Sequence, residues 1–339
     1  MSEDQKIKLA HGSGGRLMHE LVEETIVERL ANPILTELGD SAELADLVEG
    51  AAGRIAFTTD SYVVQPLFFP GGDIGKLAVA GTVNDLAVAG ARPAYLSLAL
   101  VIEEGFAIDD LRRVLDSVAS TALEAGVSVV TGDTKVVERG AIGGLVVNTS
   151  GVGVVPEGVR VGSGLAAEGD AVIVSGTIGD HETAILIARE DLAISETIES
   201  DCAPVGGLVE AVLDACPDVH VMRDPTRGGL GTTLNEIASA SNTGITIDET
   251  RIPIRREVKA ICDILGFDPI YMANEGKVVV VAPAGRAGDV VAAMRAHPLG
   301  ESAAVIGEVG GRRGVYLRTE VGGSRPVVML EGVQLPRIC

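Results

Sequence analysis

The sequence contains no tryptophan, and only four tyrosines and five phenylalanines occur among its 339 residues. Yet 46% of the residues are hydrophobic, so the core must be built mainly from valine, leucine, isoleucine and alanine. Aliphatic and β-branched residues in this proportion are typical of sheets covered by helices. The composition therefore predicts an α/β protein, and the length predicts two compact domains.

Basic residues are also scarce, because 27 lysines and arginines stand against 48 aspartates and glutamates, a net charge of −21 at pH 7. Nucleic-acid binding depends largely on lysine and arginine displacing counterions, so this charge argues against DNA or RNA as a partner. No run approaches the roughly 18 to 20 apolar residues that cross a membrane, and the first residues lack the apolar core of a signal peptide. We expect a cytoplasmic protein without membrane association.

Cysteine is rare too, and the four residues Cys202, Cys216, Cys262 and Cys339 show neither CxxC nor metal-ligand spacing. This usage suits a reducing compartment. The three internal cysteines lie in or near helical segments and are expected to be small core residues. By itself, the terminal position of Cys339 carries no functional information.

Strand-like runs alternate with amphipathic stretches along the chain, which is typical of α/β or α+β layers. The glycine-rich stretch 151–170 lacks periodicity and is interpreted as the joint between two domains. We predict an N-terminal domain over 1–160, a C-terminal α/β domain over 161–325 and a mobile tail over 326–339. Two prolines and three glycines near the chain end argue against a regular element there.

A helix is predicted from about 73 to 91, because Asp73 is a suitable N-cap and Pro93 follows the end. Asn84 and Asp85 interrupt a helix face that is otherwise made of small and apolar groups. A buried carboxylate is costly unless a cation or hydrogen-bond donors meet it. The pair is therefore either a satisfied part of the core or part of a functional site.

Two further aspartates stand where strands are expected to end, Asp60 after IAFTT and Asp133 after VSVVTG. Carboxylates at strand ends commonly face the ligand cleft of an α/β sheet. We therefore expect Asp60, Asp85 and Asp133 to converge on a hard cation such as Mg²⁺. The HGSGGR segment at 11–16 has backbone amides able to approach phosphates; the alternative is a terminal segment without structure.

The second half of the chain adds three candidates, each with a simpler structural interpretation. Asp224 precedes Pro225 and could cap a helix, or it could face phosphate together with Arg227. Glu275, in the sequence ANEGK, could be an exposed turn residue. His181 follows a glycine turn and could merely begin a helix.

The motifs TTDSYVV, GTVNDLAVAGARP, TGDTKVV, MRDPTRGG and ANEGK precede a Pro-Arg-Ile-Cys terminus at 336–339. In this order and combination they resemble the HypE family of hydrogenase maturation factors. These proteins are carbamoyl dehydratases of the ATP-binding superfamily that includes aminoimidazole ribonucleotide synthetase and selenophosphate synthetase. The resemblance covers nearly the whole chain, and it gives the terminal cysteine a function.

The resemblance implies a two-domain aminoimidazole ribonucleotide synthetase-like fold, with a homodimer formed through the N-terminal sheet and Mg-ATP bound near that interface. The residues that it implies for ATP binding are Gly12, Gly14, Gly15, Asp60, Asn84, Asp85, Gly132, Asp133 and Thr134. The glycines at 12–15 would cover the phosphates. The implied magnesium ligands are Asp60, Asp85, Asp133 and, less directly, Asp224.

By the same resemblance, Cys339 accepts a carbamoyl group from the carbamoyltransferase HypF, and ATP-dependent dehydration converts that group to a thiocyanate. The cyanide then passes to the iron of the NiFe-hydrogenase active site through HypC and HypD. The resemblance also implies that Lys135 and Glu275 lie where this group is processed. Glu275 is the simpler proton acceptor, because Lys135 would need a pKa well below about 10.4.

One position departs from the family pattern. In these proteins a glycine usually follows the histidine that matches His181, whereas Glu182 follows it here. The resemblance therefore assigns no role to His181.

Two alternatives remain open at this point. One is a small-molecule kinase or synthetase of the same superfamily, such as thiamine-phosphate kinase or selenophosphate synthetase. Selenophosphate synthetases usually need a reactive residue near the N-terminus, and no cysteine precedes Cys202 here. The other is a non-catalytic ATP-binding scaffold whose tail docks partners and which would tolerate loss of the Cys339 thiol.

Overall fold

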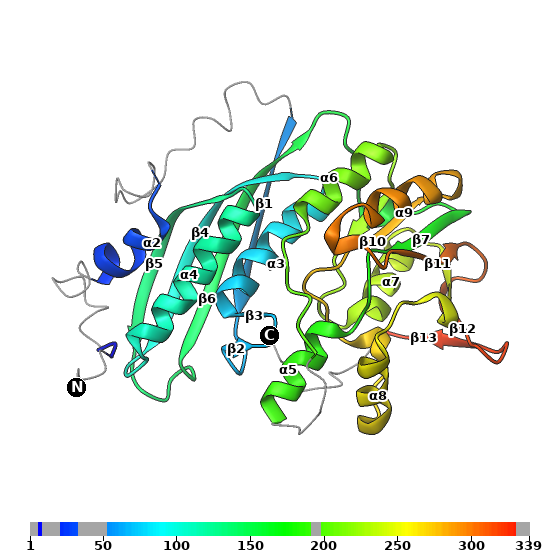
Figure 1. The fold of residues 1–339 in the computed structure, drawn as a ribbon. Helices are drawn as coiled ribbons and strands as arrows, with labels where there is room; N and C mark the ends of the chain where they lie inside the picture. Colours follow the sequence, from blue (N-terminus) through cyan, green and yellow to red (C-terminus); the bar gives the residue numbers. More distant parts are fainter. Residues whose placement is uncertain (1–5, 9–20, 33–52, 191–197, 330–339) are drawn as a thin grey trace.

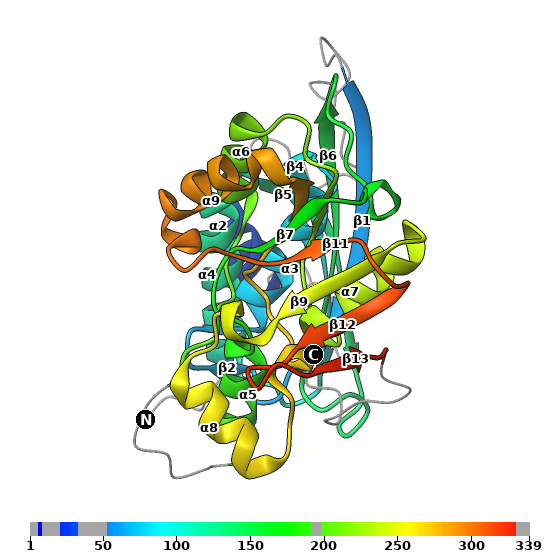
Figure 2. The same ribbon diagram turned by 90° about the vertical axis from the view of Figure 1, so that its right-hand side faces the viewer.

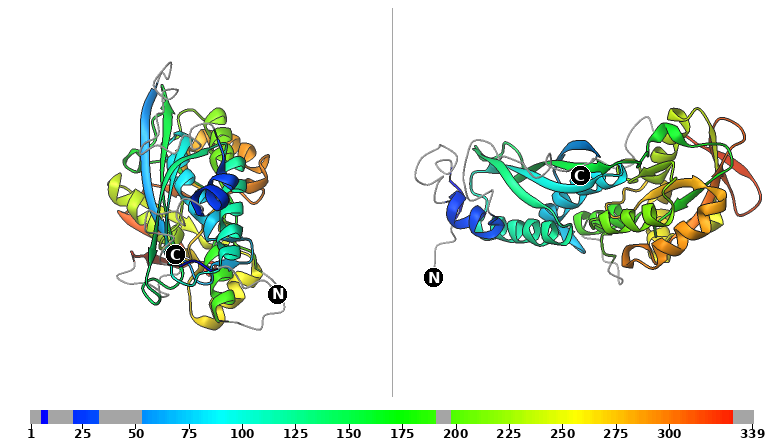
Figure 3. Two further views of the ribbon diagram at one scale, coloured as in Figure 1. Left: turned by 90° about the vertical axis from the view of Figure 1, so that its left-hand side faces the viewer. Right: turned by 90° about the horizontal axis from the view of Figure 1, so that it is seen from above.

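The computed structural model describes residues 6–8, 21–32, 53–190 and 198–329. Two large sheets lie side by side, each packed against helices, and the view from above shows the two α/β units end to end (Figures 1 and 3). The predicted division at residue 160 falls between the last strand of the first unit and the first strand of the second. Within the described residues, no helix has the length and hydropathy of a membrane span.

The first unit is built on a four-stranded sheet in the order β1-β6-β4-β5. Its strands are β1 (Gly53–Tyr62), β4 (Arg92–Glu103), β5 (Ser128–Val137) and β6 (Leu145–Pro156). Every second residue of β4 from Leu96 to Ile102 is buried, so one face of the sheet is apolar and packs against helices. The helices are α3 (Ile74–Val88) and α4 (Ile108–Glu124). Smaller elements are η2 (Val22–Val27), α2 (Glu28–Leu30), β2 (Phe68–Phe69) and β3 (Gly72–Asp73).

The opposite face of this sheet, called here the open face, is covered by neither α3 nor α4 (Figure 3). It carries Ile55 and Phe57 of β1, whose exposed fractions are 63% and 68%. These two residues pair across the sheet with Val154 and Val152 of β6, which are half-buried. An exposed apolar face of this kind is typical of an interaction surface.

The second unit is built on a seven-stranded sheet in the order β13-β12-β9-β11-β7-β10-β8, and Figure 2 shows its strands from β13 to β7 in succession. The strands are β7 (Asp170–Val174), β8 (Val221–Arg223), β9 (Gly244–Asp248), β10 (Val279–Pro283), β11 (Ala304–Val309), β12 (Gly314–Arg318) and β13 (Ser324–Val327). The central strands β7 and β10 consist almost entirely of buried residues, because helices cover both faces of the sheet.

Helix α7 (Gly229–Ala240) covers one face of this sheet, whereas α6 (Gly206–Ala215) and α9 (Ala287–Arg295) cover the other. Helices α5 (Asp180–Glu190) and α8 (Arg256–Leu265) pack against each other in a smaller cluster. Short 3₁₀ turns are η5 (Ser163–Leu165), η6 (Glu249–Arg251), η7 (Pro269–Tyr271), η8 (Ala284–Arg286) and η9 (Pro298–Gly300).

Helix α3 lies between the two units (Figure 1). Among its residues, only Lys76 and Asp85 are not buried. Most of α3 packs in the core of the first unit, but Ala87 and Val88 join the core formed around α6 and α9. The predicted N-cap is confirmed, because Asp73 Oδ1 accepts hydrogen bonds from two backbone N–H groups of the first turn, at 2.7 and 3.2 Å.

Three strands differ from the prediction. Asp60 and Asp133 do not end their strands. Strand β1 stays paired with β6 as far as Tyr62, and β5 stays paired with β4 as far as Val137. The expectation of an irregular chain end is wrong for β13, which pairs with β12. Pro326 lies in an edge strand, the position in a sheet where proline is tolerated.

Candidate active site

Asp60, Asp85 and Asp224 approach one another at the seam between the units, where β1, α3 and the loop after β8 meet. Thr58 donates a hydrogen bond to Asp85 Oδ2 at 3.0 Å, and Arg227 Nη2 lies 3.1 Å from Asp60 Oδ1. Burial, and then repulsion from Asp85, raises the pKa of Asp224 to about 6. Burial, and then the charge of Asp60, raises the pKa of Asp85. Crowded carboxylates of this kind attract a cation.

Asp224 does not cap the helix that follows it. Helix α7 begins at Gly229, and its N-cap is Gly228, whose φ of 72° lies in the left-handed region that glycine adopts without strain. The helix-capping interpretation of Asp224 is therefore wrong. Its position beside Asp85 agrees with the alternative, in which it belongs to a functional cluster.

Asn84 is buried and connects the two units. Its Nδ2 donates to the carbonyl oxygens of Ala203, at 3.0 Å, and Glu275, at 3.2 Å. Its Oδ1 accepts a hydrogen bond from the backbone N–H of Val205 at 2.8 Å. Both amide hydrogens are thus directed at protein carbonyl groups, so Asn84 ties α3 to two loops of the second unit.

Glu275 is only 8% exposed, so its interpretation as an exposed turn residue is wrong. Burial raises its pKa well above the ordinary range, and the charges of Asp224, Asp201, Asp60 and Asp85 add to that rise. Glu275 therefore lies among the same carboxylates as the three aspartates. A raised pKa makes its carboxylate, once ionised, a stronger proton acceptor than an exposed glutamate.

Asp133 and Lys135 lie elsewhere in the chain. A row of paired residues crosses the sheet from Asp60 through Thr149 and Leu98 to Gly132, so β5 is three strands, or about 14 Å, from β1. Asp60, Leu98 and Gly132 lie on the helix-covered face. Because side chains alternate along a strand, Asp133 and Lys135 lie on the open face, where both are exposed. A single chain therefore does not bring Asp133 to the other aspartates.

Residues Gly132 and Thr134 accompany Asp133 on β5. Gly132 lies directly against β4, where an added Cβ would come within 2.2 Å of the carbonyl oxygen of Leu98. Thr134 pairs with Leu100 and is half-buried. Gly12, Gly14, Gly15 and Cys339 lie outside the described residues.

The three internal cysteines are buried, as predicted. Burial raises the pKa of the Cys216 thiol to about 11 and that of Cys262 to about 12. A thiol with such a pKa is almost entirely protonated at neutral pH, and the thiolate is the nucleophile. Neither residue is suited to accept an acyl group.

Both units match known proteins. Family models described as the N-terminal and C-terminal domains of AIR synthase related proteins match residues 39–155 and 167–320. Carbamoyl dehydratase HypE of Azotobacter vinelandii is 51% identical to this chain, over 98% of this chain and 97% of the relative. The chain belongs to the HypE family.

Solved structures agree with this assignment. A crystal structure of hydrogenase maturation protein HypE in complex with ATP superposes with a TM-score of 0.93 at 46% identity, covering 98% of this chain and 99% of that one. A crystal structure of a HypE–HypF complex gives a TM-score of 0.80 at 45% identity, covering 91% and 99%. The predicted two-domain α/β fold of the superfamily is therefore confirmed.

The carboxylates of this HypE family member have the donor chemistry that Mg²⁺ prefers. Among the described residues, no three His, Cys, Asp or Glu side chains are arranged to hold a metal by themselves. Mg²⁺ does not need such a cage, because it commonly takes one or two carboxylates and completes its shell with water and phosphate oxygens. Asp60, Asp85 and Asp224 fit that requirement, and Arg227 adds a cation at the same place.

His181, which precedes the Glu182 that departs from the family pattern, is the second residue of α5 and is fully buried. Its Nδ1 lies 2.8 Å from Ser200 Oγ, and its ring meets Phe69 edge-on. Burial lowers its pKa to about 4, so the ring is neutral at pH 7. The following Glu182 accepts a hydrogen bond from the backbone N–H of Ala273 at 2.5 Å. These contacts agree with the interpretation of His181 as a helix-start residue.

Asp201 and Lys277 were missed by sequence reasoning, although they lie beside Glu275. Lys277 Nζ is 3.4 Å from Asp201 Oδ2, and the two side chains are only 11% and 2% exposed. The two residues are far apart in the sequence and belong to no common motif. Judged from its neighbours alone, each would be expected to be a charged surface residue. Only the lysine gives a weak signal, because it directly precedes the apolar run of β10.

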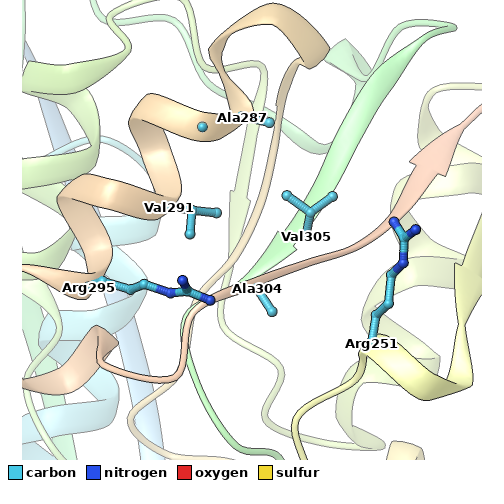
Figure 4. A pocket seen from close by; sticks show the side chains of 7 residues that line it. Arg251, Ala287, Val291, Arg295, Ala304 and Val305 are labelled. Atoms are coloured by element: carbon cyan, nitrogen blue, oxygen red, sulfur yellow. The ribbon is translucent and has the colours of Figure 1, made fainter.

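A surface pocket lies away from the carboxylates, between α9 and β11 (Figure 4). It is lined by apolar residues, including Val291 and Val305, and by the guanidinium groups of Arg251 and Arg295. None of the aspartates discussed above lines it. The pocket therefore forms no part of the candidate active site.

Proposed function

We propose that this chain dehydrates a carbamoyl group carried on the Cys339 thiol to a thiocyanate, at the expense of ATP, during hydrogenase maturation. Membership of the HypE family and the ATP complex of a relative support this proposal. The observation that carries it is the burial of Glu275, a proton acceptor, among Asp60, Asp85 and Asp224. The family favours it over the kinase or synthetase alternative, which has no use for a terminal thiol.

The reaction balances in two steps. The carbonyl oxygen of the S-carbamoyl group attacks the terminal phosphorus of ATP, an O–P bond forms and ADP leaves. The nitrogen of the resulting iminium group first loses one proton to solvent, which gives a neutral imidate. Glu275 then accepts the second proton from that nitrogen, the C–O bond breaks, phosphate leaves with the electron pair, and a C≡N bond remains on sulfur. Mg²⁺ held by the aspartates would stabilise the charge of the transferred phosphoryl group.

A homodimer through the N-terminal sheets is part of the proposal. The exposed apolar residues Ile55 and Phe57 support pairing through the open face. Asp133 and Lys135 lie on this same face, on the edge strand β5, whereas Asp60 lies on the other edge strand, β1. A pairing that sets the β5 edge of one subunit beside the β1 edge of the other would bring them to the aspartates around that edge. We infer that the partner subunit's Asp133 and the partner subunit's Lys135 complete each site, where the lysine neutralises phosphate oxygens.

The chain beyond β13 is long enough to bring Cys339 to Glu275. Tyr271 donates a hydrogen bond to the carbonyl oxygen of Val328 at 2.7 Å, and Tyr271 precedes Glu275 by a stretch of at most about 15 Å. The residues from 329 to 339 span up to about 33 Å when extended. The thiol can therefore reach Glu275 and also visit other proteins.

The proposed reaction requires one protein that donates the carbamoyl group and others that accept the cyanide. HypF would supply the carbamoyl group, and a HypE–HypF complex of a relative supports that partner. HypC and HypD would accept the cyanide for the iron of the hydrogenase. The same thiol would serve all of these encounters.

Intact-mass analysis tests the proposed function directly. The protein is incubated with HypF, carbamoyl phosphate and ATP, and we expect one carbamoyl adduct that loses one water only when ATP is present. Cys339→Ser should abolish the adduct, whereas the matched variant Cys216→Ser should keep it, because Cys216 is buried. An adduct on another cysteine would overturn the proposal. Full hydrogenase maturation by Cys339→Ser would favour the scaffold alternative.

A further inference from the structure

The backbone of Glu275 is held from both sides by residues distant in sequence. Its N–H donates to Asp201 Oδ1 at 3.2 Å, and the next N–H, of Gly276, donates to Asp201 Oδ2 at 3.3 Å. Its carbonyl oxygen accepts from Asn84 Nδ2 at 3.2 Å and from the N–H of Ala203 at 3.3 Å. Both peptide groups around Glu275 are thus fixed in orientation.

Asp201 is itself locked in place. Its partner Lys277 lies along the backbone at Gly176, where an added Cβ would come within 3.2 Å of Lys277 Cε. At Gly276 an added Cβ would come within 1.8 Å of the carbonyl oxygen of Asp201. The loops that carry Asp201 and Gly276 therefore approach as closely as glycine permits, so the backbone at Asp201 has little room to shift against Gly276, the residue next to Glu275.

We propose that Asp201, held by Lys277, is a positioning residue that orients Glu275 toward the three aspartates through its backbone. This inference rests on the proposed function, in which Glu275 accepts the proton. A carboxylate suits the position because each of its oxygens accepts one N–H while the buried ammonium group balances the charge. An asparagine would turn an NH₂ group toward one of those donors and leave Lys277 without its counter-charge.

The test uses full-length protein already carbamoylated on Cys339, mixed with ATP in a single turnover. Asp201→Asn should lose water about 10- to 100-fold more slowly than wild type, the effect expected of a misplaced reacting group. The affinity for ATP and the extent of carbamoylation should stay unchanged. The matched control is Asp73→Asn, because Asp73 also accepts two backbone N–H groups, but at the start of α3; it should retain the wild-type rate.

A double mutant separates positioning from general damage. If Asp201 acts through Glu275, Asp201→Asn should slow wild type but not the already impaired Glu275→Gln variant. Equal slowing in both backgrounds, or a wild-type rate for Asp201→Asn alone, would overturn the inference. A wild-type rate for Glu275→Gln would instead overturn the role of Glu275 in the proposed function, and the inference with it.

Thermal unfolding establishes that each variant is folded before its rate is interpreted. Should Asp201→Asn not fold, Asp201→Glu replaces it, because the longer side chain keeps the charge beside Lys277 but displaces the carboxylate from the two N–H groups. The same slowing is expected of that variant. A wild-type rate for it would overturn the inference as well.

Discussion

A buried neutral histidine makes stability depend on pH at His181. Its pKa is lowered to about 4 from the ordinary 6.5 by burial, so the unfolded chain binds more protons between these values. The stabilisation gained by keeping the ring neutral is therefore complete above pH 6.5 and is lost as the pH falls toward 4.

We expect this group to remove about 2 kcal/mol from the free energy of unfolding between pH 7 and pH 5. Urea unfolding of wild type and of His181→Gln at both pH values isolates the effect, since all other groups titrate in both proteins. The variant should lose less stability over that interval. An equal loss in both proteins would contradict the burial of a neutral His181.

The charge of Asp85 can be tested by a substitution that keeps its shape. Asp85→Asn keeps the shape that accepts the Thr58 hydrogen bond but removes a charge from the carboxylate cluster. We expect the Kd for Mg-ATP to rise at least about tenfold, a loss of about 1.4 kcal/mol. With EDTA present, binding of ATP alone should stay equal or improve, because one source of repulsion to phosphate is gone. Calorimetric titration measures both, and an unchanged Kd with magnesium would remove Asp85 from the site.

Residue patterns predicted part of this site for physical reasons. Asp85 could be found because a carboxylate on an otherwise apolar helix face requires a partner. The burial of Glu275 could not, because it depends on Asp201 and Asn84, which reach its backbone from far along the chain. Local sequence describes Glu275 as a polar turn residue, and only tertiary contacts make it a buried one.

Helix α3 joins the two units, and Asn84 is its connecting side chain. Asn84→Ala leaves the buried N–H of Val205 and the carbonyl groups of Ala203 and Glu275 without this partner. We expect the free energy of unfolding to fall by on the order of 3 kcal/mol. Urea unfolding measures the change.

The matched control is Asn148→Ala on β6. Asn148 Nδ2 also donates to the main chain, at 2.8 Å to the carbonyl oxygen of Asp60, but it lies on the open face of the sheet. Solvent can replace that bond in an isolated subunit, so the loss should be about 1 kcal/mol or less. Similar losses in the two variants would contradict the connecting role of Asn84.

The sequence predicted the start of helix α3 correctly but not the ends of strands β1 and β5. The start of α3 was found because Asp73 is a local N-cap signal. The ends of β1 and β5 were misplaced, because a strand continues as long as its neighbour offers hydrogen bonds, and β6 and β4 do so past Asp60 and Asp133. Pairing between strands is a property of the sheet rather than of the segment.

The strand order of the first sheet places Asp133 far from Asp60 and Asp85, although the sequence motifs suggested that the three aspartates converge. Asp133 lies on the far strand of the sheet from Asp60 and Asp85. Strand order is not encoded in the motifs themselves, so convergence of all three aspartates within one chain could not be tested from sequence. In the proposed homodimer, each site takes Asp85 from one subunit and Asp133 from its partner.

Subunit complementation tests this arrangement. Asp85→Ala and Asp133→Ala homodimers should each be inactive in ATP-dependent water loss, since every site lacks one aspartate. After subunits of the two variants are mixed and exchanged, half of the dimers are mixed, and one of the two sites in each mixed dimer is intact. Activity should therefore recover to roughly a quarter of wild type. Exchange is verified independently with differently tagged subunits, and no recovery after verified exchange would contradict a site shared between subunits.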